Sequence, residues 1–201
     1  MSKNLVLIFT RNPELGKVKT RLAKTIGDEK ALEVYKFLLD KTKTVTQNLT
    51  ADKAVFYSVK VRENDIWDTS IYQKYQQNGE NLGMRMQHAF EQAFENGYQK
   101  VVIIGSDLYD LTPQHINKAF KQLNSNDVVI GPADDGGYYL LGLKKVYPEI
   151  FNNKNWGSSS VRKDTLTDLK NESVYLLEKL NDIDVYDDLK NHDELLKIIE
   201  S

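Results

Sequence analysis

The sequence predicts an α/β domain with a mostly parallel central sheet flanked by helices. Short apolar runs without period-2 alternation recur along the chain, and such runs are typical of strands that are covered on both faces of a parallel sheet. Stretches with apolar residues at helical spacing separate these runs. Because strand and helix alternate, we expect a layered α/β architecture.

The expected elements follow one another along the whole chain. The clearest strands are the apolar runs at residues 5–9, 101–104 and 127–130. Further strands are expected near residues 53–58, 138–143 and 174–177. The expected helices are residues 28–48, residues 82–96 with Gly97 as the stop, a helix opened by Thr112 and Pro113, a helix after Ser158, and a final helix over residues 187–199.

We expect residues 1–201 to form one domain. The chain has only four prolines, no Gly/Ser-rich linker and no fixed-period repeat, and its charges are mixed throughout, so no boundary is indicated. A chain of this size buries about 70% of its unfolded surface, which is enough to fold without disulfides or a structural metal.

The composition excludes several classes of partner. Lys and Arg number 27 and Asp and Glu 29, a formal net charge of −2, so we expect no nucleic-acid partner. The longest apolar runs are far shorter than the ~20 residues of a membrane span, and the first stops at Thr10, too early for a signal peptide. There is no cysteine, hence no disulfide or thiolate nucleophile, and we expect a cytoplasmic protein. The sequence leaves the oligomeric state open.

In open α/β sheets, ligands collect beyond the carboxyl ends of the strands, and the first loop there is rich in cations. Residues 10–21 leave the first strand, turn through Pro13 and Gly16, and enter an expected helix. Such a junction offers free backbone N–H groups to a phosphate or diphosphate. A solvated basic helix face is the alternative, and neither common phosphate-loop signature is present. The candidate phosphate-binding residues are Arg11, Gly16, Lys17, Lys19 and Arg21.

The second loop, residues 105–111, carries two acids directly after the most apolar strand. Asp107 and Asp110 offer hard oxygen ligands, which Mg²⁺ or Mn²⁺ prefers, and Asp107 is expected at the rim of a central strand. The alternative is turn formation and helix capping before Pro113, which suits Asp110 better than Asp107.

The third loop lies within residues 131–142 and joins two expected strands. Asp134 and Asp135 could meet sugar hydroxyls or an acceptor, and Gly136 and Gly137 would let a ligand approach the backbone. Tyr138 completes the candidate substrate-binding set. The alternative is a simple hairpin turn, because Asp-Gly is a strong turn signal.

The fourth segment, residues 182–188, holds four acids. Asp182 and Asp184 would lie on one face of an extended segment, where either could complete a metal site begun by Asp107. Asp187 or Asp188 is expected to cap the final helix. The three histidines lie in separate expected helices without metal-ligand spacing, and no Gly-x-Ser-x-Gly motif surrounds the serines at 158–160, so a serine hydrolase has no support.

Five short motifs resemble a known superfamily in their order and sequence. They are GKVKTRLA at residues 16–23, NLGMRM at 81–86, GSD at 105–107, GPADDGGYYL at 131–140 and DIDVYDDL at 182–189. Together they resemble the nucleotide-diphospho-sugar transferase superfamily. More narrowly, the chain is similar to DUF2064, a small bacterial glycosyltransferase-like group that includes proteins assigned to arsenosugar biosynthesis. The resemblance covers about residues 5–196, and the stretch at 131–140 is its most specific motif.

The resemblance implies a GT-A type fold, a nucleoside diphosphate or triphosphate bound in the N-terminal half, and a divalent metal. It implies that Arg11, Lys17 and Arg21 contact phosphates, that Leu82, Gly83 and Arg85 border the base and ribose, and that Asp107 and Asp184 bind Mg²⁺ or Mn²⁺. The chain departs from the family pattern in two places. Tyr109 stands where proline is usual, and Ser106-Asp107 stands where many metal-dependent glycosyltransferases have an Asp-x-Asp pair.

These observations lead us to expect an enzyme that transfers a sugar from a nucleotide-diphospho-sugar to a small acceptor with the help of a metal. Asp107 and Asp135 are the candidate catalytic residues, and Asp135 would position or deprotonate the acceptor. One alternative is a nucleotidyltransferase that joins a nucleoside triphosphate to a phosphorylated acceptor and releases pyrophosphate. The other is an inactive nucleotide-binding scaffold.

Overall fold

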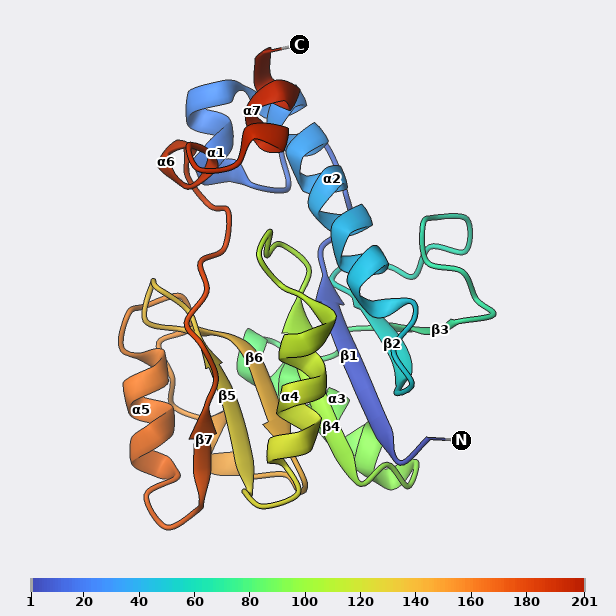
Figure 1. Cartoon of the computed structure of the whole chain (residues 1–201), viewed down its shortest axis with the longest axis vertical. Coiled ribbons are helices and arrows are strands. Elements are labelled where there is room, and N and C mark those ends of the chain that lie inside the picture. Colours follow the sequence, from blue (N-terminus) through green and yellow to red (C-terminus); the bar gives the residue numbers. More distant parts are fainter. Residues whose placement is uncertain (1, 201) are drawn as a thin grey trace.

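Seven strands form one sheet in the computed structural model, which describes residues 2–200 (Figure 1). The strand order is β3-β2-β1-β4-β6-β5-β7. Only β6 runs antiparallel to its neighbours, β4 and β5, so the expected mostly parallel sheet is confirmed. The strands are β1 (Asn4–Thr10), β2 (Asp52–Tyr57), β3 (Tyr72–Gln76), β4 (Lys100–Gly105), β5 (Val128–Pro132), β6 (Tyr138–Leu143) and β7 (Val174–Leu176).

Helices cover both faces of this sheet, as expected. The helices are α1 (Thr20–Ile26), α2 (Asp28–Thr46), α3 (Leu82–Glu95), α4 (Pro113–Gln122), α5 (Val161–Asp168), α6 (Tyr186–Leu189) and α7 (Asp193–Glu200), with one 3₁₀ turn at Pro148–Ile150. Of the helices among residues 2–200, none is long and apolar enough to cross a membrane.

The two faces of the central strands build two separate cores, because successive side chains of a strand point to opposite faces. From β1, Val6 and Ile8 pack into the core under α2 and α4, whereas Leu5 and Leu7 pack into the core under α3 and α5. Burial on both faces is the reason that β1 and β4 appear in the sequence as unbroken apolar runs.

A third core lies beyond the carboxyl end of the sheet, where α1, α6 and α7 gather around the start of α2 (Figure 1). Its buried side chains come from both halves of the chain and include Leu22, Leu38, Ile183 and Leu195. This small helical cluster therefore holds the N-terminal loop of residues 10–21 next to the C-terminal segment of residues 182–188.

The expected final helix over residues 187–199 is wrong, because the chain breaks it into α6 and α7. In one continuous helix, Leu189 and Leu195 would lie about 120° apart around the axis. The turn between them lets both side chains enter the third core, where both are fully buried. Neither Asp187 nor Asp188 is the N-cap residue of α6, which is Val185. Asp188 instead stabilises the start of this helix from the N3 position, where its Oδ2 accepts the N–H groups of Asp184 and Val185, each at 2.8 Å.

The strand β3 has no counterpart among the expected elements. It lies at the edge of the sheet, and of its five residues only Tyr72 is buried. An edge strand of polar residues lacks the apolar run that reveals a central strand, so no pattern in the sequence indicated it.

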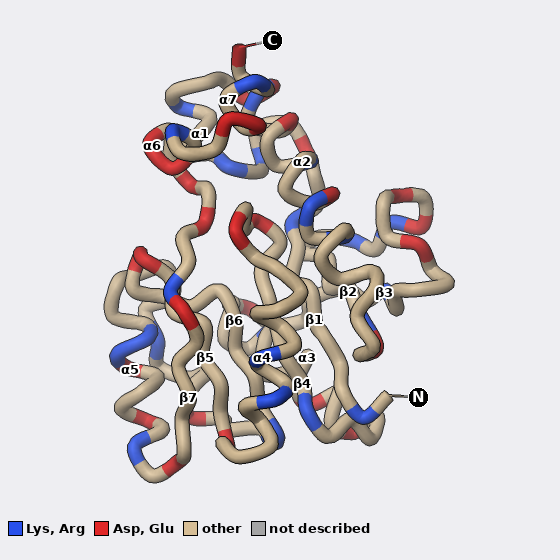
Figure 2. Tube along the Cα trace, in the orientation of Figure 1, with Lys and Arg blue, Asp and Glu red and all other residues tan. Residues whose placement is uncertain are grey.

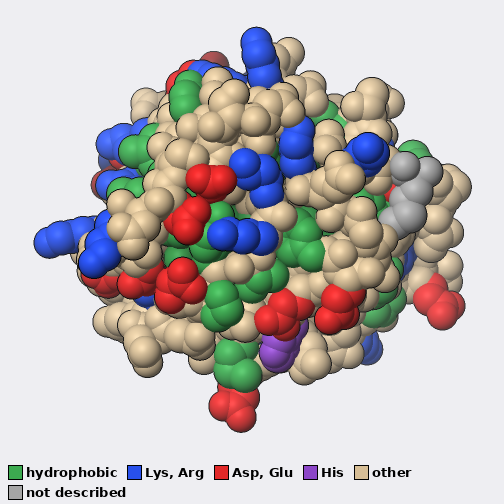
Figure 3. Space-filling view, turned by 90° about the horizontal axis from the view of Figure 1, so that it is seen from below, with side chains coloured by type: hydrophobic (Ala, Val, Ile, Leu, Met, Phe, Trp, Pro, Cys, Tyr) green, Lys and Arg blue, Asp and Glu red, His purple; other side chains and the backbone are tan. Residues whose placement is uncertain are grey.

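Two acidic segments lie close together in the folded chain, because the loop after β4 faces the segment before α6 (Figure 2). The end of the molecule opposite this region is shown in Figure 3. There, basic and acidic side chains are interspersed among apolar ones, so the described residues in that view form no extended field of one sign.

Candidate functional site

A cleft of about 770 Å³ opens at the carboxyl ends of β1 and β4. These strands are neighbours at the centre of the sheet, and the chain continues from β1 to β2 on one side and from β4 through α4 to β5 on the other. Ligands of open α/β sheets bind at such a switch point. The lining residues with polar or charged side chains include Thr10, Arg11, Lys19, Arg21, Tyr35, Arg85, Ser106, Asp107, Asp182 and Asp184.

Three aspartates meet in this cleft. One carboxylate oxygen from each of Asp107, Asp182 and Asp184 lies within 4.8 Å of the others, and we call these residues the acid trio. A backbone hydrogen bond of 3.3 Å from the Ile183 N–H to the Asp107 carbonyl joins the two segments that carry them. The structure thus brings Asp182 and Asp184 to Asp107, as the alternation of residues 182–184 predicted.

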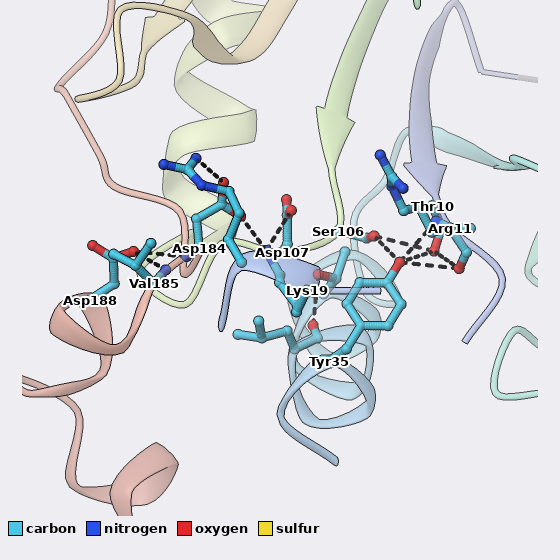
Figure 4. Close-up of polar contacts among 12 residues, drawn as sticks. Thr10, Arg11, Lys19, Tyr35, Ser106, Asp107, Asp184, Val185 and Asp188 are labelled. Carbon is cyan, nitrogen blue, oxygen red and sulfur yellow. Dashed lines mark hydrogen bonds and ion pairs between the residues drawn. The ribbon is translucent and has the colours of Figure 1, made fainter. Parts of the chain in front are cut away.

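Lys19 sits between two of these carboxylates (Figure 4). Its Nζ lies 2.8 Å from Asp107 Oδ2 and 3.0 Å from Asp184 Oδ1, and its side chain is only 4% exposed. Arg21 reaches the other oxygen of Asp184 from the solvent side, at 3.3 Å. Lys19 also has a left-handed backbone, with φ of 47°. A non-glycine residue in that region persists only where its surroundings hold it.

Two carboxyl groups of the acid trio, those of Asp107 and Asp182, have pKa values shifted in opposite directions. Burial alone would lower the pKa of Lys19, but Asp107 and Asp184 raise it above its ordinary value. Burial opposes ionisation of Asp107, yet the Lys19 ammonium holds the pKa of Asp107 below its usual range. Asp182 forms no ion pair with the described residues, and burial together with the charges of Asp107 and Asp184 raises its pKa to about 6. The trio therefore carries more negative charge than Lys19 neutralises.

The hydroxyl of Tyr35, a residue of α2, forms hydrogen bonds to several residues at the bottom of the cleft (Figure 4). Its hydroxyl lies 3.1 Å from Thr10 Oγ1 and 3.3 Å from Ser106 Oγ, and it accepts the Arg11 N–H at 2.9 Å. Thr10 ends β1 and Ser106 follows β4, so one buried side chain joins the ends of both central strands. Burial raises the pKa of Tyr35 and keeps its hydroxyl neutral.

A second cavity of about 210 Å³ adjoins the cleft and shares Leu82, Asp107 and Asp182 with it. Its charged lining residues are all acidic, and among the described residues no lysine or arginine lines it. The remaining lining is mostly apolar and aromatic, with Met86, Leu108, Tyr138, Tyr139, Trp156 and Val161.

The basic loop of residues 10–21 contributes only part of its charge to the cleft. Arg11, Lys19 and Arg21 line it, and Arg85 lines it from α3 with its Nε donating to the Gly79 carbonyl at 2.9 Å. Lys17 and Gly16 are exposed and lie outside the described lining, because the turn of residues 14–17 carries them away from the sheet.

Two glycines expected at the ligand instead make room for neighbouring protein. A Cβ on Gly136 would lie 2.2 Å from the Ser159 carbonyl oxygen, and one on Gly83 would lie 2.2 Å from the Phe151 carbonyl oxygen. Close packing of the chain against itself therefore accounts for the lack of a side chain at both positions, and neither glycine belongs to the described lining of the cleft or the second cavity.

The rest of the third loop divides between the second cavity and the surface. Asp135, Gly137 and Tyr138 line the cavity, and Asp135 Oδ1 accepts the Gly137 N–H at 2.8 Å. Burial raises the pKa of Tyr138 far above its usual value. Asp134 lies outside the described lining and forms an ion pair with Lys179, which accounts for its charge.

Tyr109 joins the loop after β4 to the third core. Its ring stacks on Phe37 of α2 and lies 4.1 Å from the His192 ring, and its hydroxyl donates to Glu194 Oε2 at 2.7 Å. The aromatic side chain thus anchors the loop that carries Asp107.

Sequence reasoning missed Tyr35 and, of the aromatic side chains that line the second cavity, Tyr139 and Trp156. Thr10 and Ser106 directly follow apolar runs, which is a signal for a position at the rim of the sheet. Tyr35 lay among the apolar residues of an expected helix and carried no such signal, because its partners become neighbours only in the folded chain.

The comparisons with known proteins agree with this fold. The family model described as "Uncharacterized protein conserved in bacteria (DUF2064)" matches residues 41–158, more than half of the chain. The chain belongs to the DUF2064 family. A solved structure of a candidate nucleotide-diphospho-sugar transferase from Desulfovibrio desulfuricans G20 is 32% identical to this DUF2064 protein, with a TM-score of 0.86 over 100% of this chain and 98% of that one. The suspected superfamily is thereby confirmed.

More distant structures share the fold alone with this DUF2064 protein. One is 4-diphosphocytidyl-2C-methyl-D-erythritol synthase from Anaerococcus prevotii DSM 20548, with 11% identity, a TM-score of 0.59 and 97% of each chain covered. Another is CMP:2-keto-3-deoxy-manno-octonic acid synthetase in complex with CTP, with 10% identity, a TM-score of 0.52 and coverage of 98% and 99%. No curated protein matches the sequence.

The Tyr35 hydroxyl is expected to be worth about 1–2 kcal/mol of stability, because Tyr35→Phe removes the acceptor of the Arg11 N–H and one hydrogen-bond partner each of Thr10 and Ser106. Tyr72→Phe is the matched control, since Tyr72 OH bonds Thr46 and Lys43 far from the cleft. Urea denaturation should show a loss for both variants, whereas only Tyr35→Phe should weaken nucleotide binding. Equal nucleotide affinities in the two variants would contradict the role given to Tyr35.

The close packing at Gly136 can be tested by Gly136→Ala. Its φ of +91° and the contact with Ser159 should together cost more than ~2 kcal/mol. Gly97→Ala is the control, because Gly97 has a φ of +86° but nothing within 4 Å of an added Cβ. Thermal melts should rank Gly136→Ala as the less stable variant, and equal melting temperatures would rule out the steric contribution.

Proposed function

We propose that this protein transfers a sugar from a nucleotide-diphospho-sugar to a small acceptor, with a divalent metal at the acid trio. The observation that carries the proposal is the pairing of two cavities across Asp107 and Asp182. The larger cleft is lined by four basic side chains as well as the acid trio, whereas the smaller cavity has only acidic charges in its described lining. The larger cleft thus suits a diphosphate, and the smaller cavity suits an uncharged group.

The donor fits the larger cleft by size and by charge. Arg11, Lys19, Arg21 and Arg85 line it, and guanidinium and ammonium groups are the usual partners of phosphate oxygens. Their positive charge would stabilise the diphosphate as it departs, and one well-placed donor of this kind contributes about 3 kcal/mol to catalysis.

The acid trio fits a divalent cation by its donor set. Three carboxylates converge within 4.8 Å, and hard oxygen ligands at this spacing suit Mg²⁺ or Mn²⁺. Asp107 and Asp184 are the ligands we propose, and Asp182 lies close enough to be a third. When bound, the metal would supply positive charge to the departing diphosphate.

The acceptor fits the second cavity. The aromatic rings of Tyr138, Tyr139 and Trp156 offer flat apolar surfaces against which a sugar or a similar ring can pack. We propose that Asp135 accepts the proton of an acceptor hydroxyl as its oxygen bonds to the sugar carbon and the bond from that carbon to the diphosphate breaks. Asp135 is exposed, so it can exchange this proton with solvent.

Nucleotidyl transfer to a phosphorylated acceptor is the competing function, and the charge of the second cavity disfavours it. A phosphate placed there would meet Asp107, Asp135 and Asp182 and no basic side chain of the described lining. Like charges at such distances oppose binding, whereas a neutral acceptor meets no such barrier.

The product distinguishes the two reactions. We expect release of a nucleoside diphosphate when the protein is incubated with Mn²⁺, a panel of UDP-, GDP- and CDP-sugars, and neutral or phosphorylated small hydroxyl compounds. Pyrophosphate release from nucleoside triphosphates, measured in parallel, would contradict sugar transfer. Nucleotide binding that is unaffected by Mn²⁺, without any product, would indicate a scaffold.

The role of Asp107 predicts a large effect of Asp107→Asn. Losing one carboxylate of the acid trio should reduce Mn²⁺-dependent turnover at least a hundredfold, because several kcal/mol of charge stabilisation is removed. Asp110→Asn is the control, since Asp110 lies in the same loop but outside both cavities. Circular dichroism should show both variants folded, and near-normal turnover of Asp107→Asn would refute the assignment.

A further inference from the structure

We propose that Lys19 is an exchangeable internal cation, which occupies the metal position of the acid trio until a nucleotide diphosphate draws its ammonium away. Metal and nucleotide then bind with positive coupling, each tightening the other. This inference rests on the proposed function, because it assigns an order of events to the same site.

The contacts of Lys19 place its charge where a metal would bind. Its ammonium lies 2.8 Å and 3.0 Å from oxygens of Asp107 and Asp184, the two ligands proposed for the metal. The lysine side chain is 4% exposed, whereas those of Asp107 and Asp184 are 34% and 39% exposed. The carboxylates are therefore accessible from the cleft while their present cation lies behind them.

A metal that binds alone must compete with this ammonium. Mg²⁺ coordinates oxygen at about 2.0–2.1 Å, so it would take oxygens that now accept the Lys19 hydrogen bonds and would repel the ammonium at close range. Displacing Lys19 would break two charge-assisted hydrogen bonds and leave a buried ammonium without a partner, which is strongly unfavourable. The protein without nucleotide should therefore bind divalent cations weakly.

A diphosphate removes this obstacle. Lys19 lines the cleft together with Arg11, Arg21 and Arg85, so phosphate oxygens bound there can replace Asp107 and Asp184 as its acceptors. A lysine suits the exchange, because its point charge sits on a flexible four-carbon chain that can change partner without a shift of the backbone. By linkage, the gain in metal affinity caused by nucleotide equals the gain in nucleotide affinity caused by metal.

The test measures Mn²⁺ affinity without nucleotide, by the electron paramagnetic resonance signal of free Mn²⁺, in the wild type and in Lys19→Met. Removing the internal cation should tighten Mn²⁺ binding at least tenfold. Lys24→Met is the matched control, because Lys24 is an exposed lysine of the same helix outside the cleft, and its affinity should equal that of the wild type.

A second variant keeps the test decisive if Lys19→Met fails to fold. Lys19→Arg retains the charge and can bind a carboxylate through two parallel hydrogen bonds, so it should weaken Mn²⁺ binding below that of the wild type. In a third measurement, UDP, GDP and CDP should each be titrated with and without Mn²⁺, after correction for Mn²⁺ bound to free nucleotide. The metal should tighten binding of the preferred nucleotide in the wild type and much less in Lys19→Arg.

The outcomes separate this inference from the proposed reaction. A folded Lys19→Met that binds Mn²⁺ no more tightly than the wild type, or a Lys19→Arg that binds it more tightly, overturns the exchange even if sugar transfer is observed. Tighter Mn²⁺ binding by Lys19→Met supports the exchange even if no nucleotide sugar is turned over, in which case the proposed function alone fails.

Discussion

The ion pairs of Lys19 with Asp107 and Asp184 connect three parts of the chain that are distant in sequence. They join the loop after β1, the loop after β4 and the segment before α6. A buried ammonium without these carboxylates would be unstable, and so would the carboxylates without a cation. Site and fold at this edge of the sheet therefore depend on the same contact.

The third core explains how the C-terminal segment reaches the site. Ile183 is buried between Asp182 and Asp184, so packing of one apolar side chain turns its two acidic neighbours towards the cleft. Tyr109 does the same for the loop of Asp107 by stacking on α2 and bonding α7. Apolar and aromatic contacts outside the cleft thus hold the carboxylates close together inside it. Without these contacts, repulsion between like charges would keep the carboxylates apart.

Much of this arrangement is predictable from the sequence, because buried parallel strands leave unbroken apolar runs and their carboxyl ends share one edge. That argument is sufficient to place Asp107 near the basic loop. It fails for β3, whose polar edge position has no apolar pattern, and for the break at residues 190–192, which depends on the third core. It also fails for Lys17, since the direction of a turn, not the local charge, decides which lysine enters the cleft.

The net negative charge of the acid trio favours replacement of the Lys19 ammonium by a divalent cation. Three carboxylates and the Lys19 ammonium sum to −2 when all are ionised. Burial, together with the charges of Asp107 and Asp184, accordingly raises the pKa of Asp182. A divalent cation in place of the ammonium reduces the sum to −1, and the released ammonium is then free to offset a diphosphate. Replacing the ammonium by a divalent cation thus lowers the net negative charge of the acid trio. It also releases the Lys19 ammonium towards the diphosphate, where negative charge develops as the leaving group departs.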